Sequence, residues 1–318
     1  MSADTATVVH DNRQAFAEAL TELARADRRV VVVCNDSIGS SNLVGFRREF
    51  PDRLVNVGIA EQDMVGVGAG LANAGLVPFV CGAAPFLTGR SLEQIKADIA
   101  YSQFPVALCG MSPGMAYGAL GATHHSVEDL SWLRALPGLD ILVLADEQET
   151  RQAVRLAARQ EHPVYLRVGR TPVPAVNPPD AELVRGRWTL LREGTDVTLL
   201  AAGTLVSRAL AAAEELADEG IDARVLNASW ISPLDTEAVL AAASETAGIV
   251  TAEEANVSGG LGAAVASLVV TGGSLVPMRL LGLKDEFAPT GPTGFLLDYF
   301  RLNPAGIADA AREIVRDA

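Results

Sequence analysis

The sequence is poor in aromatic residues and contains no apolar run long enough to cross a membrane. Aromatic residues make up only 5% of the chain, so its 49% hydrophobic content is mostly alanine, valine and leucine. Such small aliphatic residues suit buried parallel strands and closely packed helices. The apolar run 261–270 is shorter than the roughly 20 residues that a membrane-spanning helix needs. We therefore expect no membrane association.

Cysteine is scarce, and no secretory signal is visible at the N-terminus. The three cysteines, Cys34, Cys81 and Cys109, each lie in an apolar stretch and show no spacing typical of a metal site. Buried free thiols are expected for such cysteines in a reducing compartment. The N-terminal residues lack the charged-then-apolar pattern of a signal peptide. These features predict a cytoplasmic protein.

Positive charge is outweighed by negative charge. The chain has 25 lysine and arginine residues against 39 aspartate and glutamate residues, so its formal net charge is −14. A strongly acidic surface repels phosphate backbones, and we therefore expect no nucleic-acid partner. The first predicted strand is not followed by G-x-G-x-x-G, which disfavours a plain dinucleotide-binding protein.

Strand-like and helix-like segments alternate through the first half of the chain. Buried strands are predicted by β-branched or apolar runs, and helices by apolar residues at helical spacing. The predicted strands are 29–34, 54–57, 77–81, 105–109, 140–145 and 164–168, and the predicted helices are 13–25, 61–74, 91–102, 126–136 and 147–160. Gly75 is the expected C-cap of the second helix, and Ser126 begins an SVED sequence that predicts a capping box. This alternation predicts a parallel sheet covered on both faces.

A proline-rich segment divides the sequence. Residues 171–181 hold four of the 16 prolines, which is typical of a stiff connector. Beyond it the alternation restarts, with predicted strands 197–201, 223–227, 248–251 and 276–281 and predicted helices 206–219, 235–243 and 261–270. The sequence therefore predicts two doubly wound α/β domains with mostly parallel sheets, residues 1–175 and 187–318, joined by a linker over 176–186.

A carboxylate follows the second predicted strand. Glu61 lies where that strand ends and a glycine-rich helix begins. Ligands bind at the carboxyl ends of strands in open α/β sheets. A glutamate buried there is expected to have a raised pKa and to share a proton with a ring nitrogen. The position equally fits a glutamate that stabilises the helix dipole, so both roles stay open.

Two adjacent histidines and one phenylalanine follow other predicted strands. His124 and His125 lie in the glycine-, serine- and methionine-rich loop 110–125. Histidine is the usual proton shuttle near neutral pH, although an exposed loop histidine is the plainer alternative. No further ligand lies at a spacing that indicates a metal site, so none is expected in this chain. Phe86 could offer its face to a ring or could pack in the core.

At these residues the sequence resembles the transketolase family, most of all the C-terminal subunit of split transketolases. The most recognisable match is NVGIAEQDMVGVGAGLANAG, and FLTGRSLEQIKADIAYSQFPV, GATHHSVEDLSWLRALP and VYLRVGR follow in the family's order. EEANVSGGLGAAVA and GLKDEFAPTG match the family's C-terminal domain. The resemblance covers essentially the whole chain. It implies a domain that binds the pyrimidine of thiamine diphosphate, followed by a transketolase C-terminal domain.

The resemblance implies catalytic and cofactor-binding roles. Glu61 matches the glutamate that contacts N1′ of the cofactor's aminopyrimidine and favours the imino tautomer, whose nitrogen removes the thiazolium C2 proton. Phe86 matches the aromatic residue that stacks on the pyrimidine, and His124 matches the histidine that faces the reacting carbonyl and hydroxyl groups. The other expected cofactor contacts lie in the same motifs and are Ile59, Gln62 and Arg90.

The resemblance also implies residues that hold a sugar phosphate. Arg13 and Arg170 match family arginines with this role, which suits the planar fork of arginine. Ser40 or Ser41 matches a serine that contacts phosphate. Two alternatives stay open: Arg13 as a surface helix residue, and Arg167 in place of Arg170.

Three positions depart from the family's pattern. Leu120 stands where the family usually has aspartate, Ser112 where it has histidine, and Ala83 where an aromatic residue is common. Positions 112 and 120 are expected to line the substrate site, and polar groups left unpaired in such a pocket weaken binding. We therefore expect the cofactor chemistry to be kept and the substrate to differ, as in a specialised ketol or acyl transfer of secondary metabolism.

The sequence contains no Gly-Asp-Gly segment, which in this family begins the site for the metal and the diphosphate. We expect a separate N-terminal transketolase subunit to supply that segment, with Mg²⁺ or Ca²⁺ bound there and no metal ligand on this chain. Because the family's cofactor spans two subunits, an α2β2 heterotetramer is expected, in which two copies of this chain associate.

Two other interpretations remain at this point. The chain could be the β-subunit of a 2-oxo-acid dehydrogenase, which shares the two-domain arrangement, although the GATH segment and VYLRVGR favour transketolase. It could also be a non-catalytic assembly subunit, since a fold alone does not establish activity. The retention of both Glu61 and His124 favours an enzyme.

Overall fold

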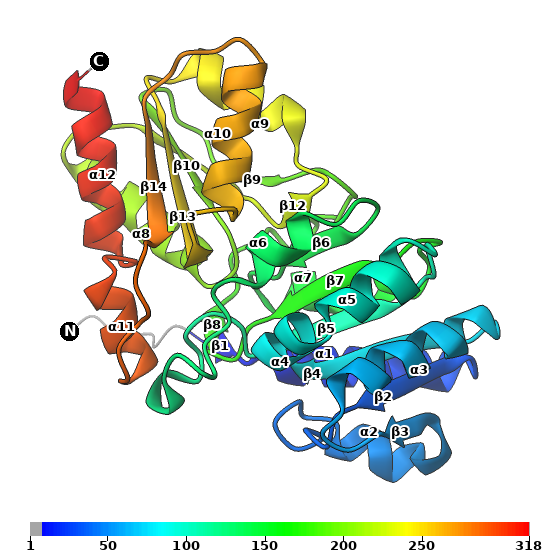
Figure 1. The fold of residues 1–318 in the computed structure, drawn as a ribbon. Coiled ribbons are helices and arrows are strands. Elements are labelled where there is room, and N and C mark those ends of the chain that lie inside the picture. The colour runs from blue at the N-terminus through cyan, green and yellow to red at the C-terminus, as the bar shows by residue number, and fades with distance from the viewer. Residues whose placement is uncertain (1–7, 318) are drawn as a thin grey trace.

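The computed structural model describes residues 8–317, which form two α/β units (Figure 1). The first unit is built on a seven-stranded sheet with the order β12–β6–β7–β5–β4–β2–β3. Six of its strands come from the first half of the chain and run parallel: β2 (Val30–Cys34), β3 (Leu54–Asn56), β4 (Val77–Ala83), β5 (Ala107–Met111), β6 (Asp140–Val143) and β7 (Val164–Val168). Strands β2, β5, β6 and β7 are wholly buried, and β4, which lies between β5 and β2, is buried except at Val77.

Helices cover both faces of the first sheet. The helices of this half are α1 (Asn12–Ala26), α2 (Val44–Glu49), α3 (Glu61–Asn73), α4 (Ala84–Arg90), α5 (Leu92–Gln94), α6 (Asp129–Arg134) and α7 (Glu147–Ala157), with short helical turns at Pro51–Arg53, Ile95–Ala100 and Gly118–Leu120. Helices α1 and α7 pack against each other, whereas α4 lies between α3 and α6 (Figure 1). The C-cap of α3 is Ala74, and Gly75, the predicted C-cap, follows it with a positive φ of 85°, which favours glycine at this position.

The second unit contains a five-stranded sheet with the order β14–β13–β10–β11–β9. Its strands are β9 (Thr189–Arg192), β10 (Val197–Ala201), β11 (Ala223–Asn227), β13 (Ile249–Asn256) and β14 (Met278–Leu283), and only the edge strand β9 runs antiparallel. The helices are α8 (Leu205–Asp218), α9 (Thr236–Glu245), α10 (Leu261–Thr271), α11 (Thr293–Tyr299) and α12 (Pro304–Asp317). Helices α8 and α12 pack together on one face, and α9 and α10 on the other (Figure 1).

The two units share a strand. The short strand β12 (Trp230–Ser232) belongs to the second half of the chain but extends the first sheet, antiparallel to β6. Trp230 in this strand is fully buried, and the indole of Trp188 donates a hydrogen bond of 2.8 Å to its carbonyl oxygen. The sequence does not predict this exchange, because a three-residue strand has no periodic signal of its own.

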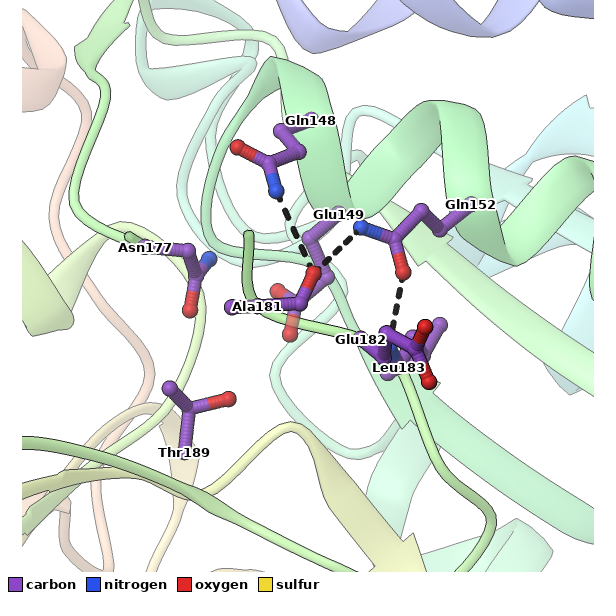
Figure 2. A pocket seen from close by; sticks show the side chains of 8 residues that line it. All are labelled: Gln148, Glu149, Gln152, Asn177, Ala181, Glu182, Leu183 and Thr189. Atoms are coloured by element: carbon purple, nitrogen blue, oxygen red, sulfur yellow. Dashed lines mark hydrogen bonds between the residues drawn. The ribbon is translucent and has the colours of Figure 1, made fainter. Parts of the chain in front are cut away.

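The connector between the units lies against α7 instead of spanning open solvent. After β8 (Val173–Pro174), which pairs with β1 (Val9–His10), the chain runs along that helix. Figure 2 shows Gln148 and Gln152 of α7 reaching the backbone of Ala181 and Leu183. The carbonyl oxygens of Pro178 and Pro179 in this segment also accept hydrogen bonds from the side chain of Gln148.

One local prediction was wrong. The hydroxyl of Ser126 does not cap α6, which begins three residues later after Glu128 without a side-chain cap. Instead, the backbone of Ser126 exchanges two hydrogen bonds of 2.8 Å with the backbone of Gly114. This long-range pairing wins over the local capping pattern. No helix among residues 8–317 has the length and apolar character that crossing a membrane requires.

Candidate functional site

The predicted site residues gather at one edge of the first sheet. Strands β2, β4, β5 and β7 are parallel neighbours, so their carboxyl ends meet at the same edge. The segments that leave these strands carry, in chain order, Asn35, Phe86 and Arg90, His124, and Arg170. Glu61 joins them because it begins α3 after β3. This is the edge at which open α/β sheets bind ligands.

Glu61 is buried and held by two side chains. Only 4% of its surface is exposed. Its Oε1 atom accepts a hydrogen bond of 2.8 Å from Asn35 Nδ2 and another of 2.9 Å from a guanidinium nitrogen of Arg90. The carboxylate is therefore fixed from β2 on one side and from α4 on the other.

The charge state of Glu61 differs from the sequence-based prediction. Burial raises its pKa, as expected, but the hydrogen bonds from Asn35, from its own backbone amide and from Arg90 outweigh burial. The net pKa of Glu61 lies below its ordinary value. The prediction of a raised pKa was wrong, because it took account of burial and not of donors that come from distant elements.

Asn35 is a site residue that the sequence analysis missed. Its Oδ1 atom accepts a hydrogen bond of 2.6 Å from the Ser37 hydroxyl, which turns the amide nitrogen toward Glu61. Gly82 makes room for it, since a Cβ atom there would lie 3.3 Å from Asn35 Oδ1. A signal was present: a polar residue directly follows the all-valine-and-cysteine strand β2.

A chain of ring contacts extends from Arg90 to Arg170. The Arg90 guanidinium lies 4.2 Å from the centre of the Phe86 ring, and that ring lies 5.2 Å from the His124 ring, edge to face. The His124 ring lies 6.1 Å from the Tyr117 ring, which Arg170 covers at 5.0 Å. The structure thus brings together four residues that the sequence singled out, and adds Tyr117.

The two adjacent histidines have different surroundings. His124 is partly exposed, and its Nδ1 atom lies 3.0 Å from the Thr123 hydroxyl. His125 is buried, and burial lowers the pKa of its imidazole. Of the two, His124 is the one whose ring faces Phe86.

The arginines predicted to hold a phosphate differ in how far other protein groups already occupy their guanidinium groups. Arg13 donates to both carboxylate oxygens of Asp11 and, at 2.9 Å, to the carbonyl oxygen of Ser40, so its guanidinium is largely occupied. Arg167 is buried and forms an ion pair with Asp129 at 2.8 Å. Arg170 is only partly buried and stacks on Tyr117, which favours it over Arg167 as a ligand contact.

The remaining predicted residues vary in exposure. Ile59 is 78% exposed and Leu120 is 55% exposed, whereas Ser41 and Ser112 are fully buried. Ser112 has a positive φ of 57° at the end of β5, and its amide donates to the Val168 carbonyl oxygen. Two further predicted residues are Gln62, which is exposed, and Ser40, whose hydroxyl donates to the Ser37 carbonyl oxygen. None of the predicted site residues lines the small polar pocket between α7 and the linker (Figure 2).

The fold and this site belong to a known class of protein. The family model of the transketolase pyrimidine binding domain matches residues 9–175, and that of the transketolase C-terminal domain matches residues 186–307. The chain therefore belongs to the transketolase family, which confirms the predicted family and fold class. The family depends on thiamine diphosphate.

Relatives of similar length define the type of subunit more closely. The chain is 46% identical over 305 residues to an apulose-4-phosphate transketolase subunit of Phocaeicola vulgatus, in a match that covers 96% of this chain and 97% of that protein. It is 39% identical over 305 residues to the 6-deoxy-6-sulfo-D-fructose transketolase subunit SqwH of Clostridium sp. (strain MSTE9), covering 96% and 94%. The chain is a transketolase-type transferase subunit that works with a partner subunit.

A solved structure agrees with this assignment. A split gene transketolase, an inactive beta4 tetramer, matches with a TM-score of 0.87 and 36% identity, covering 98% of this chain and 99% of that one. A transketolase from Pichia stipitis shares the fold at a TM-score of 0.80 and 19% identity, and this chain spans 47% of its length. These comparisons fit the predicted C-terminal subunit of a split transketolase and not the β-subunit of a 2-oxo-acid dehydrogenase.

Proposed function

We propose that this chain is the subunit of a split transketolase that transfers a two-carbon ketol unit between non-standard sugar substrates. One observation carries the proposal: the buried Glu61 carboxylate accepts a hydrogen bond from Arg90, whose guanidinium lies 4.2 Å from the centre of the Phe86 ring, and that ring lies 5.2 Å from the ring of His124. A buried carboxylate, an aromatic face and a partly exposed imidazole in this order suit a bound ring next to a reacting carbonyl group.

The residues present fit the aminopyrimidine of thiamine diphosphate. Both side-chain hydrogen bonds to Glu61 end on Oε1, and within residues 8–317 no side-chain donor reaches Oε2, which we propose accepts from the N1′ side of the ring. Phe86 would provide the flat contact, with Arg90, Ile59 and Gln62 near the same ring. When bound, thiamine diphosphate supplies a nucleophilic carbon; Glu61 holds the proton at the ring nitrogen, and His124 binds oxygen atoms of the substrate.

We propose that the substrate differs from ordinary pentose phosphates. Leu120 exposes an apolar side chain in the loop that carries His124, and the buried Ser112 hydroxyl replaces a larger polar group. Arg170 would bind a phosphate or another anionic group, and Arg13 and Ser40, which contact each other, would shape the far end of the site. The relatives act on apulose 4-phosphate and 6-deoxy-6-sulfo-D-fructose, which supports a non-standard sugar.

The proposal includes an α2β2 heterotetramer with an N-terminal transketolase subunit. That subunit would hold the diphosphate through Mg²⁺ or Ca²⁺, since this chain lacks Gly-Asp-Gly. Ile59 supports a subunit contact here, because an isoleucine that is 78% exposed lies two residues from the buried Glu61. Apolar side chains exposed next to a site are commonly covered by a partner.

We also propose that the protein works in the cytoplasm. The three cysteines are buried and free. Burial raises the pKa of the Cys34 thiol to about 11, which keeps it protonated and unreactive. Unpaired thiols of this kind suit a reducing compartment.

Reconstitution tests the proposal. The chain is purified with and without a partner that carries Gly-Asp-Gly and a later asparagine, and ketol transfer is measured with thiamine diphosphate and Mg²⁺. We expect the complex to use apulose 4-phosphate or a sulfonated ketose at least about tenfold better than xylulose 5-phosphate with ribose 5-phosphate, since one lost polar contact changes binding by this order. Tight cofactor binding by the chain alone would contradict the shared site, and decarboxylation of pyruvate would contradict ketol transfer.

A further inference from the structure

The loop that carries His124 is anchored by the second unit. Before His124, the Met115 amide donates a hydrogen bond of 2.7 Å to Glu254 Oε1 of β13, and the Met115 carbonyl oxygen accepts from the Thr293 hydroxyl at 3.2 Å. After His124, the Val127 carbonyl oxygen accepts from the Asn256 amide at 2.6 Å. Strand β13 thus holds both ends of the loop.

The neck of this loop is closed and packed. Gly114 and Ser126 exchange two backbone hydrogen bonds, which fixes the distance between the two ends. The side chains of Met115 and Val127 are buried in the hydrophobic core of the second unit, together with residues of β10, β13 and α8. A displacement at Met115 is therefore transmitted to the segment that bears His124. Two further hydrogen bonds hold this segment: Arg167 donates to the Ser126 carbonyl oxygen at 2.9 Å, and the Gly291 amide donates to the Gly118 carbonyl oxygen at 3.1 Å.

Glu254 is the side chain on which this neck depends. It is 6% exposed, and its second oxygen, Oε2, accepts a hydrogen bond of 2.8 Å from the Thr204 hydroxyl. Gly114 lies directly against the carboxylate: a Cβ atom there would lie 2.5 Å from Glu254 Cδ, and its φ of +65° also favours glycine. Because only glycine permits this approach, the loop backbone and the carboxylate are matched in shape.

We propose that Glu254 is a positioning residue through which the C-terminal domain sets the location of His124. The inference rests on the proposed function, in which His124 faces the substrate. Glu254 does not touch the ring contacts of the site itself; it acts through Met115 and the loop neck. The C-terminal domain then contributes to the reaction without contributing a group that contacts the substrate.

Two substitutions in β13 test this in the reconstituted complex. Glu254→Ala removes the acceptor for Met115, and we expect kcat/KM for the acceptor to fall about 100-fold, the order expected when a reacting group shifts by about 1 Å. Glu254→Gln keeps an acceptor oxygen and should stay within about fivefold of the wild type. Glu253→Ala is the matched control: Glu253 is equally buried but binds the amides of Leu261 and Gly262 at the start of α10.

A glycine substitution can displace the Glu254 carboxylate without changing residue 254 itself. Gly114→Ala should reproduce the loss seen in Glu254→Ala, because its Cβ atom meets Glu254. Gly220→Ala is the control, since Gly220 has a similar positive φ of 83° but no atom within 4 Å of its Cβ position. Gly220→Ala should lower thermal stability and leave kcat/KM of the folded complex unchanged.

Hydrogen exchange of the Met115 amide gives a readout that does not depend on turnover. It should speed up in Glu254→Ala and Gly114→Ala and remain slow in Glu253→Ala. If Glu254→Ala and Glu253→Ala lose activity only in proportion to their unfolded fraction, Glu254 is structural and the inference is overturned. If the wild-type complex transfers no ketol unit, the proposed function fails, whereas the exchange rates still decide whether Glu254 fixes the loop.

Discussion

Glu61 of the first unit and Glu253 of the second are both almost fully buried, yet their surroundings differ. Glu61 accepts two side-chain hydrogen bonds on one oxygen, and the partly exposed Arg90 is one of the donors. Glu253 accepts backbone amides on both oxygens, 2.6 Å from Leu261 and 2.8 Å from Gly262. The pKa of Glu61 lies below its ordinary value, whereas burial raises that of Glu253 to about 7.

The comparison teaches how to distinguish a functional carboxylate from a structural one. Burial alone does not separate them, because both residues are shielded from water. The distribution of donors does: Glu253 has both oxygens occupied by the first amides of α10, as a helix start requires, whereas both side-chain donors to Glu61 reach a single oxygen. Glu61 therefore keeps one oxygen without a side-chain donor, whereas Glu253 uses both oxygens to stabilise the start of a helix.

The largest expected effect is the loss of kcat in Glu61→Gln, and Glu253→Gln is its control. Glu61→Gln keeps the shape and the Oε1 acceptor but cannot hold a proton, so kcat of the reconstituted complex should fall about 1000-fold, within the range of general acid–base catalysis. Glu253→Gln should leave kcat unchanged in the folded complex. Steady-state kinetics normalised to the folded fraction measures both, and equal losses in the two variants would break the comparison.

The next effect is a dependence of the free energy of unfolding on pH, caused by two buried carboxyl groups. Burial raises the pKa of Glu253 and of Glu149 to about 7, from an ordinary value of 4.5. A carboxyl group with a raised folded-state pKa stabilises the fold below pH 4.5, and this contribution is lost as the pH rises through 7. The free energy of unfolding should thus fall between pH 5 and 8 by up to about 3 kcal/mol for each group.

Denaturant unfolding of the chain at pH 5.5 and 8 tests this dependence. Glu149→Gln and Glu253→Gln should each flatten the profile, because glutamine does not titrate. Glu237→Gln, at an exposed position of α9, should leave it unchanged. A profile that is as steep in both buried variants as in the wild type would show that these carboxyl groups titrate normally.

The smallest expected effect is that of substituting Asn35, which tests how much its hydrogen bond lowers the pKa of Glu61. Asn35→Leu removes one donor to Glu61, which raises the pKa of Glu61, and kcat should fall about tenfold, the order of one hydrogen bond to a charged group. The limb of the pH–rate profile that reports Glu61 should move to higher pH. Asn35→Asp should move it further, because a second negative charge opposes ionisation. An unchanged profile would assign the lowered pKa to Arg90 alone.

Much of the fold could be predicted from local patterns. The strands at 30–34, 164–168, 197–201 and 223–227 and the helices α1, α3, α8 and α10 were predicted to within a few residues, because each has a continuous apolar run or a helical period. The strands β1, β8, β9 and β12 were not predicted. Each is short and owes its existence to a partner strand far away in the chain.

The candidate site also contains residues that the sequence indicated and residues that only the structure revealed. Glu61, Phe86, His124 and Arg170 follow strands and carry chemically useful groups, so the sequence singled them out. Asn35 was overlooked although it directly follows a predicted strand, and the choice between Arg167 and Arg170 stayed open. Only the structure shows that Arg167 is paired with Asp129 in the interior and that Asn35 donates to Glu61.

The sequence by itself determined the alternation of strands and helices, the family and the identity of the reactive side chains, because these depend on local periodicity and on residue type. Tertiary structure alone decided the ionisation of Glu61, the strand shared between the two units and the anchoring of the His124 loop by Glu254. Each of these depends on groups brought together from distant parts of the chain, and a hydrogen bond responds to distance in space and not to separation in sequence.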